Sequence, residues 1–420
     1  MAHYGMVETR TPEELRGWLR LVTEPGLSRA AARHLLKELG LPQHIFAASS
    51  AALARHVPQD LAARLSAAPE SDIQSALDTA VQILSRPNHH LLTLADPGYP
   101  AALFDTGDPP LLLFVRGNPE LLVRPSVAIV GARSATEGGR DNARAFARYL
   151  AARGWTIISG LARGIDAAAH EGALQAGTTG GSTVAVLACG LDIVYPRQHT
   201  ALTEAIAADG CVVTEYPPGT PAQPFRFPDR NRLVAALSRG VLVVEAAAQS
   251  GSLLTAKLAL ECGREVFAIP GSIHAPLARG CHALIRQGAK LVEQGRDIEE
   301  ELLRTGPVPA GVAASVPGSP PAPRDDRRAN GEWTTARARG YEEEPSTTAR
   351  SVTRMLKDPT VGRVLAALGY DPADTDQLCR RSGLAFSRVA AVLTELELNE
   401  VVQRLDDGRY VRRQQGIIYG

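Results

Sequence analysis

The spacing of apolar residues changes along this chain, and the changes mark its predicted domains. Between residues 11 and 86, apolar positions recur every three or four residues, which predicts a domain of amphipathic helices. Between residues 88 and 304, β-rich apolar runs alternate with helical stretches, which predicts a doubly wound α/β sheet. Residues 305–350 are rich in Pro, Gly, Ala, Ser, Arg and Glu and poor in aliphatic side chains, so we expect a disordered linker. Helical spacing returns in a small final domain at 353–414.

The N-terminal region contains a turn between two predicted helices. Pro25 and Gly26 interrupt the helical spacing, and Ser28 is a residue type that caps the helix that follows. A helix, a short glycine turn and a second helix resemble a helix-hairpin-helix (SAM-like) unit, whose hairpin offers backbone N–H groups to a phosphate. A helical packing domain that touches no DNA explains the same residues, and both interpretations stay open.

The central region carries the most informative pattern. Its first predicted strand, 126–130, is a continuous apolar run of the kind that a parallel sheet buries on both faces. Further strands are predicted at 156–158, 183–187, 211–214, 241–245 and 266–269. Ligands of such sheets lie beyond the carboxyl ends of the strands. Here those ends lead into loops rich in Gly, Ser and Arg, among them GARSAT, SGLARG and EAAAQSGS.

These loops suit an anion such as phosphate. Gly131 and Gly160 let the backbone approach a ligand closely, and the N–H groups that open the helices after GARSAT and SGLARG carry positive partial charge. Arg133 and Arg163 add permanent cations, so a nucleotide or a nucleic acid is the expected ligand. No GxGxxG follows the first strand, and residues 251–257 lack the spacing of a P-loop, which disfavours ATP hydrolysis of the P-loop type.

The segment PFRFPDRNR, at 224–232, distinguishes a nucleic acid from a nucleotide. It contains two aromatic residues and three Arg in nine positions. Aromatic faces stack bases while Arg residues follow phosphates, and this combination is typical of single-strand binding. An amphipathic helix start with solvated Arg and a core Phe is the alternative.

Composition narrows the possible functions. The 420 residues contain 45 Lys+Arg and 45 Asp+Glu, so the formal net charge of zero argues against coating nucleic acid through bulk charge. No run approaches the roughly 18 apolar residues of a membrane span. The first residues lack the apolar core of a secretory leader, so we expect a cytoplasmic protein with no membrane association. The five Cys are scattered without zinc spacing, and neither a metal nor a cofactor is expected.

Seven motifs in a fixed order give a more specific indication. They are VAIVGARSAT, SGLARGIDAAAH, VAVLACGLDIVYP, TEYPPG, FPDRNRLVAALSRGVLVVEA, SGSLLTAKLALECGREVFAIPGS and GCHALIRQGAKLV. The set, over roughly residues 90–295, resembles the DNA-processing protein A (DprA/Smf) family. The resemblance implies an extended Rossmann-like domain that binds single-stranded DNA without sequence preference and has no catalytic activity. It also implies that the protein protects incoming strands and loads the RecA recombinase during natural transformation and recombination.

The resemblance also implies particular site residues. The implied strand-binding pocket contains Gly131, Arg133, Ser134, Ser159, Gly160, Arg163, Gly164, Phe227, Arg230, Asn231 and Arg232, bordered by Ser250, Gly251 and Ser252. A homodimer is implied as well, with His282 and Leu291 as interface candidates in a stretch where the recombinase contact would also map. His199 and His282 stand where Asn is more usual in the family, and helix capping is one explanation of both.

Three residues with reactive side chains are interpreted as structural. Asp166 and His170 lie four residues apart on one helix face, and no third ligand or nucleophile is adjacent in the sequence. We therefore expect them to shape and cap the SGLARG motif. Cys189 is expected to be a small residue at the end of a strand.

The final domain is predicted to be a winged helix. Helices at 361–368, 375–381 and 387–398 precede a hairpin with an Asp-Gly turn at 407–408. The third helix carries Glu395, Glu397 and Glu400, which would repel phosphates in a groove. Auxiliary DNA contact through Arg409, Arg412 and Arg413 and a protein-interaction role both stay open.

Two other functions compete with a single-strand binder. Nucleotide phosphoribohydrolases have a similar fold, but they carry PGGxGTxxE, and residues 245–252 lack both the Gly pair and the Glu. A sequence-specific regulator driven by the winged helix leaves the central motifs unexplained. The single-strand binder is therefore the preferred interpretation.

Overall fold

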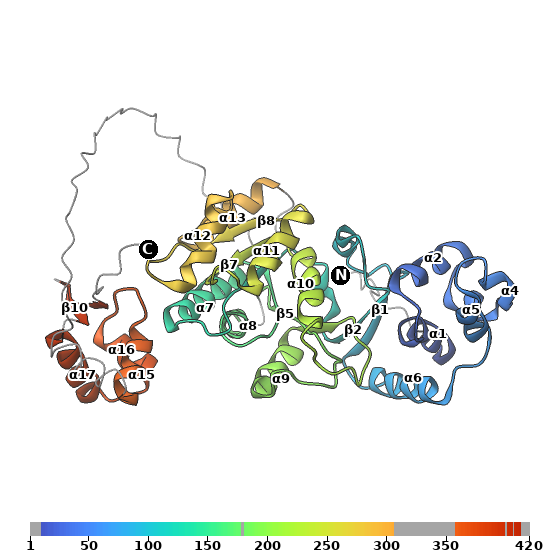
Figure 1. Cartoon of the computed structure of the whole chain (residues 1–420), viewed down its shortest axis with the longest axis horizontal. Helices are drawn as coiled ribbons and strands as arrows, with labels where there is room; N and C mark the ends of the chain where they lie inside the picture. Colours follow the sequence, from blue (N-terminus) through green and yellow to red (C-terminus); the bar gives the residue numbers. More distant parts are fainter. Residues whose placement is uncertain (1–9, 178–179, 306–357, 400, 406, 413–420) are drawn as a thin grey trace, which may run out of the picture. The chain divides into compact units, whose positions relative to one another are not determined.

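The computed structural model describes residues 10–177, 180–305, 358–399, 401–405 and 407–412 (Figure 1). The chain forms two compact units that divide between Gly311 and Val312. The linker predicted at 305–350 lies outside the described residues after Thr305, so that prediction and the domain boundaries around it stay predictions.

The first unit begins with a group of helices. They are α1 (Pro12–Thr23), α2 (Arg29–Leu39), α3 (Pro42–Ala47), α4 (Ser50–Leu53), α5 (Gln59–Ser66) and α6 (Ser71–Leu84). Ser28 accepts a hydrogen bond from the Ala31 N–H, as its sequence position predicts for a helix cap. The helices bury Leu19 and Leu35 in an apolar cluster that also contains Phe114 and Val212 of the sheet. The helical region and the sheet therefore share one core.

The described residues form a nine-stranded sheet in the order β1-β2-β6-β5-β4-β3-β7-β8-β9. The seven neighbouring strands β6-β5-β4-β3-β7-β8-β9 are parallel to one another. β2 pairs antiparallel with both β1 and β6. Their bounds are β1 (His89–Thr93), β2 (Leu112–Gly117), β3 (Ser126–Val130), β4 (Thr156–Ser159), β5 (Thr183–Val186), β6 (Cys211–Thr214), β7 (Gly240–Val243), β8 (Glu265–Ala268) and β9 (Lys290–Leu291). The predicted doubly wound α/β sheet is confirmed, and the two antiparallel strands extend it at one edge.

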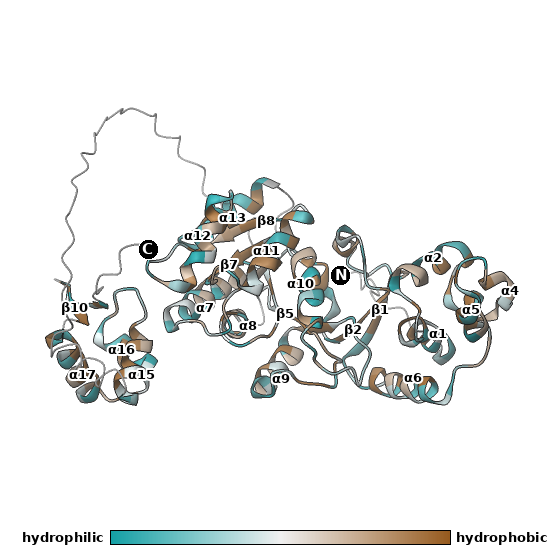
Figure 2. Ribbon diagram, in the orientation of Figure 1, coloured by the Kyte–Doolittle hydropathy of each residue, from teal (hydrophilic) through white to brown (hydrophobic). Residues whose placement is uncertain are grey.

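Helices cover both faces of the sheet. They are α7 (Glu137–Ala152), α8 (Ile165–Leu174), α9 (Thr200–Asp209), α10 (Arg226–Leu237), α11 (Gly251–Glu261), α12 (Arg279–Arg286) and α13 (Gly295–Thr305), with 3₁₀ turns at Ala101–Thr106, Pro119–Leu122, Arg197–His199 and Pro276–Ala278. Alternate strand residues point to opposite faces, and Ala128 and Val130 of β3 pack with Val234 of α10 and Ala256 of α11. Figure 2 shows these strands as brown, hydrophobic ribbon, which explains the continuous apolar runs in the sequence.

The second unit has the three helices and the hairpin predicted for a winged helix. They are α15 (Pro359–Leu368), α16 (Thr375–Ser382), α17 (Phe386–Leu398), β10 (Val402–Arg404) and β11 (Tyr410–Arg412). Gly383 ends α16 with a φ of 65°, a left-handed conformation that suits glycine, at the predicted turn. Among the described helices of both units, none has the length and apolar character needed to span a membrane.

Candidate nucleic-acid interface

The glycine-rich and arginine-rich loops meet where the order of strand addition reverses. β3 lies between β4 and β7 in the sheet, and the chain adds strands on the β4 side before it returns to add β7 on the other side. The connections that follow β3 and β7 therefore run in opposite directions and leave a crevice between them at the carboxyl edge of the sheet. Three cavities open in this region, and Arg133 lines all of them. Two of them, of about 200 and 170 Å³, share Phe227 and together are called the Phe227 pocket. The third, of about 530 Å³, is called the arginine cavity.

The structure brings most of the predicted site residues together. Twelve of the fourteen line at least one of these cavities: Gly131, Arg133, Ser134, Gly160, Arg163, Gly164, Phe227, Arg230, Asn231, Ser250, Gly251 and Ser252. Ser159 does not, because it is buried and its hydroxyl donates to the Ile129 carbonyl at 2.7 Å. Arg232 does not either, because its buried guanidinium is paired with carboxylates outside these cavities.

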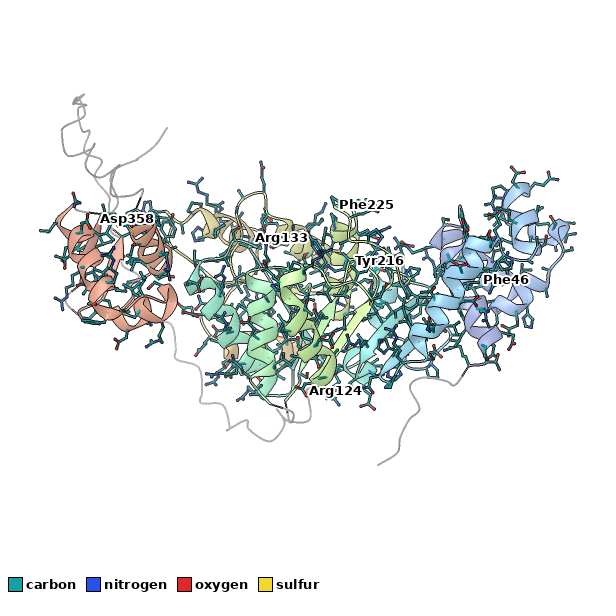
Figure 3. All side chains as sticks on the ribbon, turned by 90° about the horizontal axis from the view of Figure 1, so that it is seen from below. Phe46, Arg124, Arg133, Tyr216, Phe225 and Asp358 are labelled. Atoms are coloured by element: carbon teal, nitrogen blue, oxygen red, sulfur yellow. The ribbon has the colours of Figure 1, made fainter. Side chains whose placement is uncertain are left out.

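Arg133 and Phe227 form the mouth of the Phe227 pocket. The Cζ atom of Arg133 lies 5.1 Å from the centroid of the Phe227 ring, and the Tyr195 ring lies 5.4 Å from the same ring. Arg133 and Arg163 are exposed, and neither forms an ion pair with a carboxylate of the described chain within 4 Å. Figure 3 labels Arg133 and Phe225 on the same side of the central sheet. The pocket therefore combines an exposed Tyr195 ring and a half-buried Phe227 ring, which Arg133 covers, with cations that have no carboxylate partner among the described residues.

Arg230 lies beneath this mouth and is buried. Its Nη1 group donates to the carbonyls of Gly160, at 2.5 Å, and Val186. Burial lowers the pKa of the Arg230 guanidinium although Asp166 is near. A Cβ at residue 160 would collide with this guanidinium, which explains the glycine. Arg230 thus supports the loop, and its geometry does not favour the phosphate contact predicted for it.

Arg232 is buried in a different network. Its guanidinium forms ion pairs with Glu215 and, at 3.3 Å, with Asp229, and it donates to the Asp108 carbonyl at 2.9 Å. A buried, paired Arg232 does not fit the phosphate contact predicted for it. It does not fit the alternative interpretation either, in which this segment is an amphipathic helix start whose arginines are solvated. Phe225, which is 65 % exposed, likewise differs from the core Phe of that alternative. The sequence showed the residue types of this helix but not which face each occupies.

The N-terminus of α7, the helix after GARSAT, differs from the sequence expectation. The carboxylate of Glu245 accepts hydrogen bonds from the backbone N–H and the hydroxyl of Thr136, at 2.9 and 2.6 Å, so the start of α7 already holds an anion. The expectation that this helix end is offered to phosphate is wrong, because a strand-end carboxylate occupies it.

The N-terminus of α11 opens into the Phe227 pocket instead. Ser250, Gly251 and Ser252 all line the pocket, and the first turn of α11 carries no acidic side chain. A Cβ at Gly251 would meet nothing within 4 Å, so the backbone here is open to a ligand. The Ser250 hydroxyl caps this helix by accepting the Ser252 N–H at 3.3 Å, and no carboxylate lies in the first turn, so the positive end of the helix faces the pocket without an opposing charge.

The residues interpreted as structural have structural contacts. The Asp166 carboxylate accepts the N–H groups of Gly160, at 3.1 Å, and Ala162, at 3.3 Å, which shapes the SGLARG loop as expected. His170 is buried against the Thr183 hydroxyl at 2.7 Å, and burial lowers its pKa to about 3. Burial raises the pKa of the Cys189 thiol to about 11. In the described part of the chain, no cluster of three or more His, Cys, Asp or Glu is placed to hold a metal ion.

Comparison with known proteins identifies the family. A model described as DNA recombination-mediator protein A matches residues 90–303, which is half of the chain, and a model described as the DprA winged helix domain matches residues 344–408. The chain belongs to the DNA processing protein A (DprA/Smf) family.

Several relatives show how far this similarity extends. Protein Smf of Escherichia coli (strain K12) is 45% identical over 230 residues, which are 54% of this chain and 61% of that protein. Protein Smf of Synechocystis is 38% identical over 337 residues, which are 78% of this chain and 81% of that protein. The X-ray structure of DprA from Streptococcus pneumoniae is 35% identical and covers 70% of this chain and 99% of that one, with a TM-score of 0.54. The match therefore spans less than two thirds of the Escherichia coli relative.

Sequence reasoning missed several residues of this DprA-family site. Tyr195 and Gln198 line the cavities from the loop before α9, Thr255 does so from α11, and Arg140 and Arg144 do so from α7. A detectable pattern existed for the two arginines, because they lie four residues apart on the helix that follows GARSAT. Tyr195 ends the CGLDIVY segment, but nothing in the sequence placed its ring beside Phe227.

His199 and His282 do not cap helices through their side chains. His199 Nδ1 lies 3.0 Å from the Leu161 carbonyl, and no side-chain bond caps α9. His282 lies within α12, with Nε2 3.0 Å from the Gly271 carbonyl. Leu291 is 44 % exposed on β9, which is an edge strand of the sheet. The helix-capping explanation is therefore wrong for both histidines.

The arginines suggested for DNA contact in the winged helix are largely engaged. Arg412 donates to the Leu365 carbonyl at 2.5 Å and stacks on Tyr370 at 5.1 Å. Arg409 forms an ion pair with Asp407 at 2.6 Å, and Arg413 and Glu400 lie outside the described residues. Both interpretations of this domain stay open, although Arg412 is poorly placed for DNA.

Proposed function

We propose that the Phe227 pocket binds single-stranded DNA without sequence preference. The observation that carries this proposal is the position of Arg133 over Phe227, 5.1 Å from the ring centroid, with no carboxylate partner among the described residues. A phosphate can therefore recruit Arg133 without breaking an ion pair. The movement would expose the ring face to a base. Stacking of this kind tolerates every base, because each base has a π-face.

The same geometry favours single strands over duplex. Bases of a duplex are stacked on one another and are not available to Phe227 or Tyr195. The α11 N-terminus and Arg163 contact backbone phosphates, which carry no sequence information. We therefore expect weak discrimination between sequences.

We further propose that the protein is a non-catalytic cytoplasmic mediator, which protects incoming strands and loads RecA during natural transformation and recombination. Membership of a family described as recombination mediators supports this role. The carboxylate that lines the Phe227 pocket, that of Asp166, is buried and engaged by two N–H groups, so it is poorly placed as a general base. Residues 245–252 also lack the motif of the phosphoribohydrolases.

A homodimer through the surface near β9 belongs to the same proposal. Leu291 exposes an apolar side chain on an edge strand, and Ile273, which is 71 % exposed, lies two residues after Gly271, the partner of His282. Exposed apolar side chains at a sheet edge favour association with a second chain.

The binding proposal is tested by fluorescence anisotropy with labelled oligo-dT and with a blunt duplex of the same length. We expect tighter binding to oligo-dT, and weaker binding of oligo-dT by Phe227→Ala and Arg133→Ala. Equal affinity for both DNAs, unaffected by either substitution, would contradict the proposal. Release of adenine from AMP would instead favour the phosphoribohydrolase. The loading role predicts faster RecA assembly on strands coated with single-strand binding protein, measured by RecA ATPase activity.

A further inference from the structure

A row of arginines follows α7 away from the Phe227 pocket. Arg140, Arg144 and Arg148 are spaced four residues apart, so they share one side of the helix at intervals of about 6 Å along its axis. Arg140 and Arg144 line the arginine cavity together with Arg133 and Arg163. Arg148 lies one turn beyond the cavity and is exposed. The row is therefore continuous with the site already described.

The arginine cavity differs from the Phe227 pocket in its chemistry. Its lining contains no Phe, Tyr or Trp, whereas the Phe227 pocket contains Phe227 and Tyr195. The one ring in its lining, the imidazole of His199, is buried, so bases that enter the cavity would find no exposed aromatic face. Four guanidinium groups line it against one carboxylate, that of Glu171. This composition suits the phosphates of a nucleic-acid backbone and not its bases.

The carboxylates near the row leave the guanidinium groups available. Arg140 pairs with Glu137, and Arg144 pairs with Glu171 at 2.8 Å and with Asp141 at 3.2 Å. All of these side chains are 28–48 % exposed, and exposed ion pairs are weak because water screens them. Each guanidinium has five N–H donors, so a phosphate can bind beside the carboxylate or displace it.

The N-terminus of α7 cannot replace these side chains. The Glu245 carboxylate already lies at this helix end, where it accepts the N–H and the hydroxyl of the N-cap residue Thr136. A phosphate that passes this helix must therefore be held by the arginine side chains.

We propose that Arg140, Arg144 and Arg148 form a second binding site, which holds successive backbone phosphates of a strand that leaves the Phe227 pocket. The proposal rests on the proposed function, because it requires a strand in that pocket. The helical spacing of the row approximates the length of one extended nucleotide. Each arginine therefore meets the next phosphate along the strand.

The experiment measures oligo-dT affinity as a function of strand length and salt concentration. The minimal strand is the shortest oligo-dT whose affinity depends on Phe227, and longer strands add one nucleotide at a time. We expect the wild-type protein to gain affinity as the DNA becomes longer than the minimal strand. Arg148→Ala, which lies outside the cavities, should bind the minimal strand as the wild type does but lose part of the gain. The double variant with Arg144→Ala should lose more of the gain than Arg148→Ala does. For long strands, the slope of log affinity against log salt should flatten by about 0.7 for each arginine removed.

Arg124→Ala is the matched control. Arg124 is an exposed arginine paired with Glu120 at 3.6 Å, and Figure 3 shows it on the opposite side of the central sheet from Arg133. The Arg124→Ala protein should bind oligo-dT of every length as the wild type does. Arg148→Glu should weaken binding of long strands more than Arg148→Ala, because it replaces an attractive charge by a repulsive one.

The outcomes separate this proposal from the one on which it rests. If the α7 variants bind every length as the wild type does, or weaken the minimal strand as much as the long strands, the second site is wrong. If Phe227→Ala and Arg133→Ala leave all lengths unaffected, the Phe227 pocket is wrong, whatever the α7 variants do. Loss confined to long strands in Arg148→Ala, together with loss at all lengths in Phe227→Ala, supports both.

Discussion

The Arg133 guanidinium lies over the Phe227 ring, with 5.1 Å between Cζ and the ring centroid. The two side chains come from different elements, the loop after β3 and the start of α10, and they offer a strand two kinds of contact. A cation acts on phosphates and depends on salt, whereas an aromatic face acts on bases and depends little on salt. The two contributions can therefore be separated by measurement.

The first prediction concerns this pair. Phe227→Ala should weaken oligo-dT binding by about 1–3 kcal/mol through lost stacking, with the salt slope nearly unchanged. Arg133→Ala should flatten the slope by about 0.7 because one phosphate contact is lost. Anisotropy titrations across a salt series measure both effects. Because the side chains touch, the double variant should show a non-additive loss, and strictly additive losses would mean that the two act independently.

The second prediction concerns Arg230, which the structure places beneath the pocket. Arg230→Met should lower the free energy of unfolding by about 2–3 kcal/mol, because it leaves the buried carbonyls of Gly160 and Val186 without their donor. Urea denaturation measures the loss.

Arg163→Met provides the contrast for Arg230, because Arg163 is exposed on the same site. It should flatten the salt slope and leave stability unchanged. If Arg230→Met instead flattens the slope at full stability, Arg230 contacts phosphate after all.

The contrast between these residues shows where sequence reasoning succeeds and where it stops. The apolar run that forms β3 and the glycine-rich loop after it are local features, so the sheet and its functional edge could be predicted. The burial of Arg230 depends on Gly160, seventy positions away. Likewise, the occupation of the α7 N-terminus depends on Glu245, which follows a different strand. Such long-range contacts leave no local pattern in the sequence. Residue types could therefore predict which side chains gather at the site, but not which of them face a ligand and which support the loops.

The third prediction concerns pH. The Thr183 hydroxyl donates to the Ile157 carbonyl, so His170 Nδ1–H must donate to Thr183, which leaves Nε2 buried and without a partner in the described chain. Protonation of Nε2 is unfavourable there, and burial lowers the His170 pKa from 6.5 to about 3. Between these values the unfolded chain binds a proton that the folded chain does not bind. Stability should therefore fall as the pH is lowered, by up to about 1.4 kcal/mol per pH unit below pH 6.

Urea denaturation at pH 7.5, 6 and 5 tests this prediction, with His170→Gln as the comparison. The variant should lose much less stability over the same range, because glutamine does not titrate. Parallel losses in both proteins would assign the pH dependence to other groups.

The fourth prediction concerns assembly. If the proposed dimer forms, Leu291→Arg should convert it to monomers, because a charge on the β9 edge would be buried without a partner in the proposed interface. Leu260→Arg is the matched control, since Leu260 is 58 % exposed on α11 and lies outside the proposed interface. Sedimentation velocity reports both. A Leu291→Arg protein that remains dimeric, or a Leu260→Arg protein that becomes monomeric, would place the interface elsewhere.

The last prediction concerns the N-terminal helices, for which the sequence left DNA binding and packing both open. Arg29 of α2 forms ion pairs with Glu215 at 2.8 Å and with Asp229 of α10 at 3.3 Å. Asp229 lies two residues after Phe227, so this contact fixes the helix that carries the pocket's aromatic ring. Glu215 is buried, and removing one of its cationic partners leaves its charge less compensated.

Arg29→Met should therefore lower the free energy of unfolding by about 1–3 kcal/mol. It should also weaken oligo-dT binding without changing the salt slope, because α10 loses a support while every phosphate contact remains. Arg16→Met removes an exposed ion pair with Asp78 on the same group of helices. It should change neither the free energy of unfolding nor the affinity for oligo-dT. Urea denaturation and salt-dependent anisotropy, applied to the wild type, Arg29→Met and Arg16→Met, distinguish a packing role of these helices from DNA contact. A flatter slope for Arg29→Met at unchanged stability would mean that the N-terminal helices contact the DNA directly.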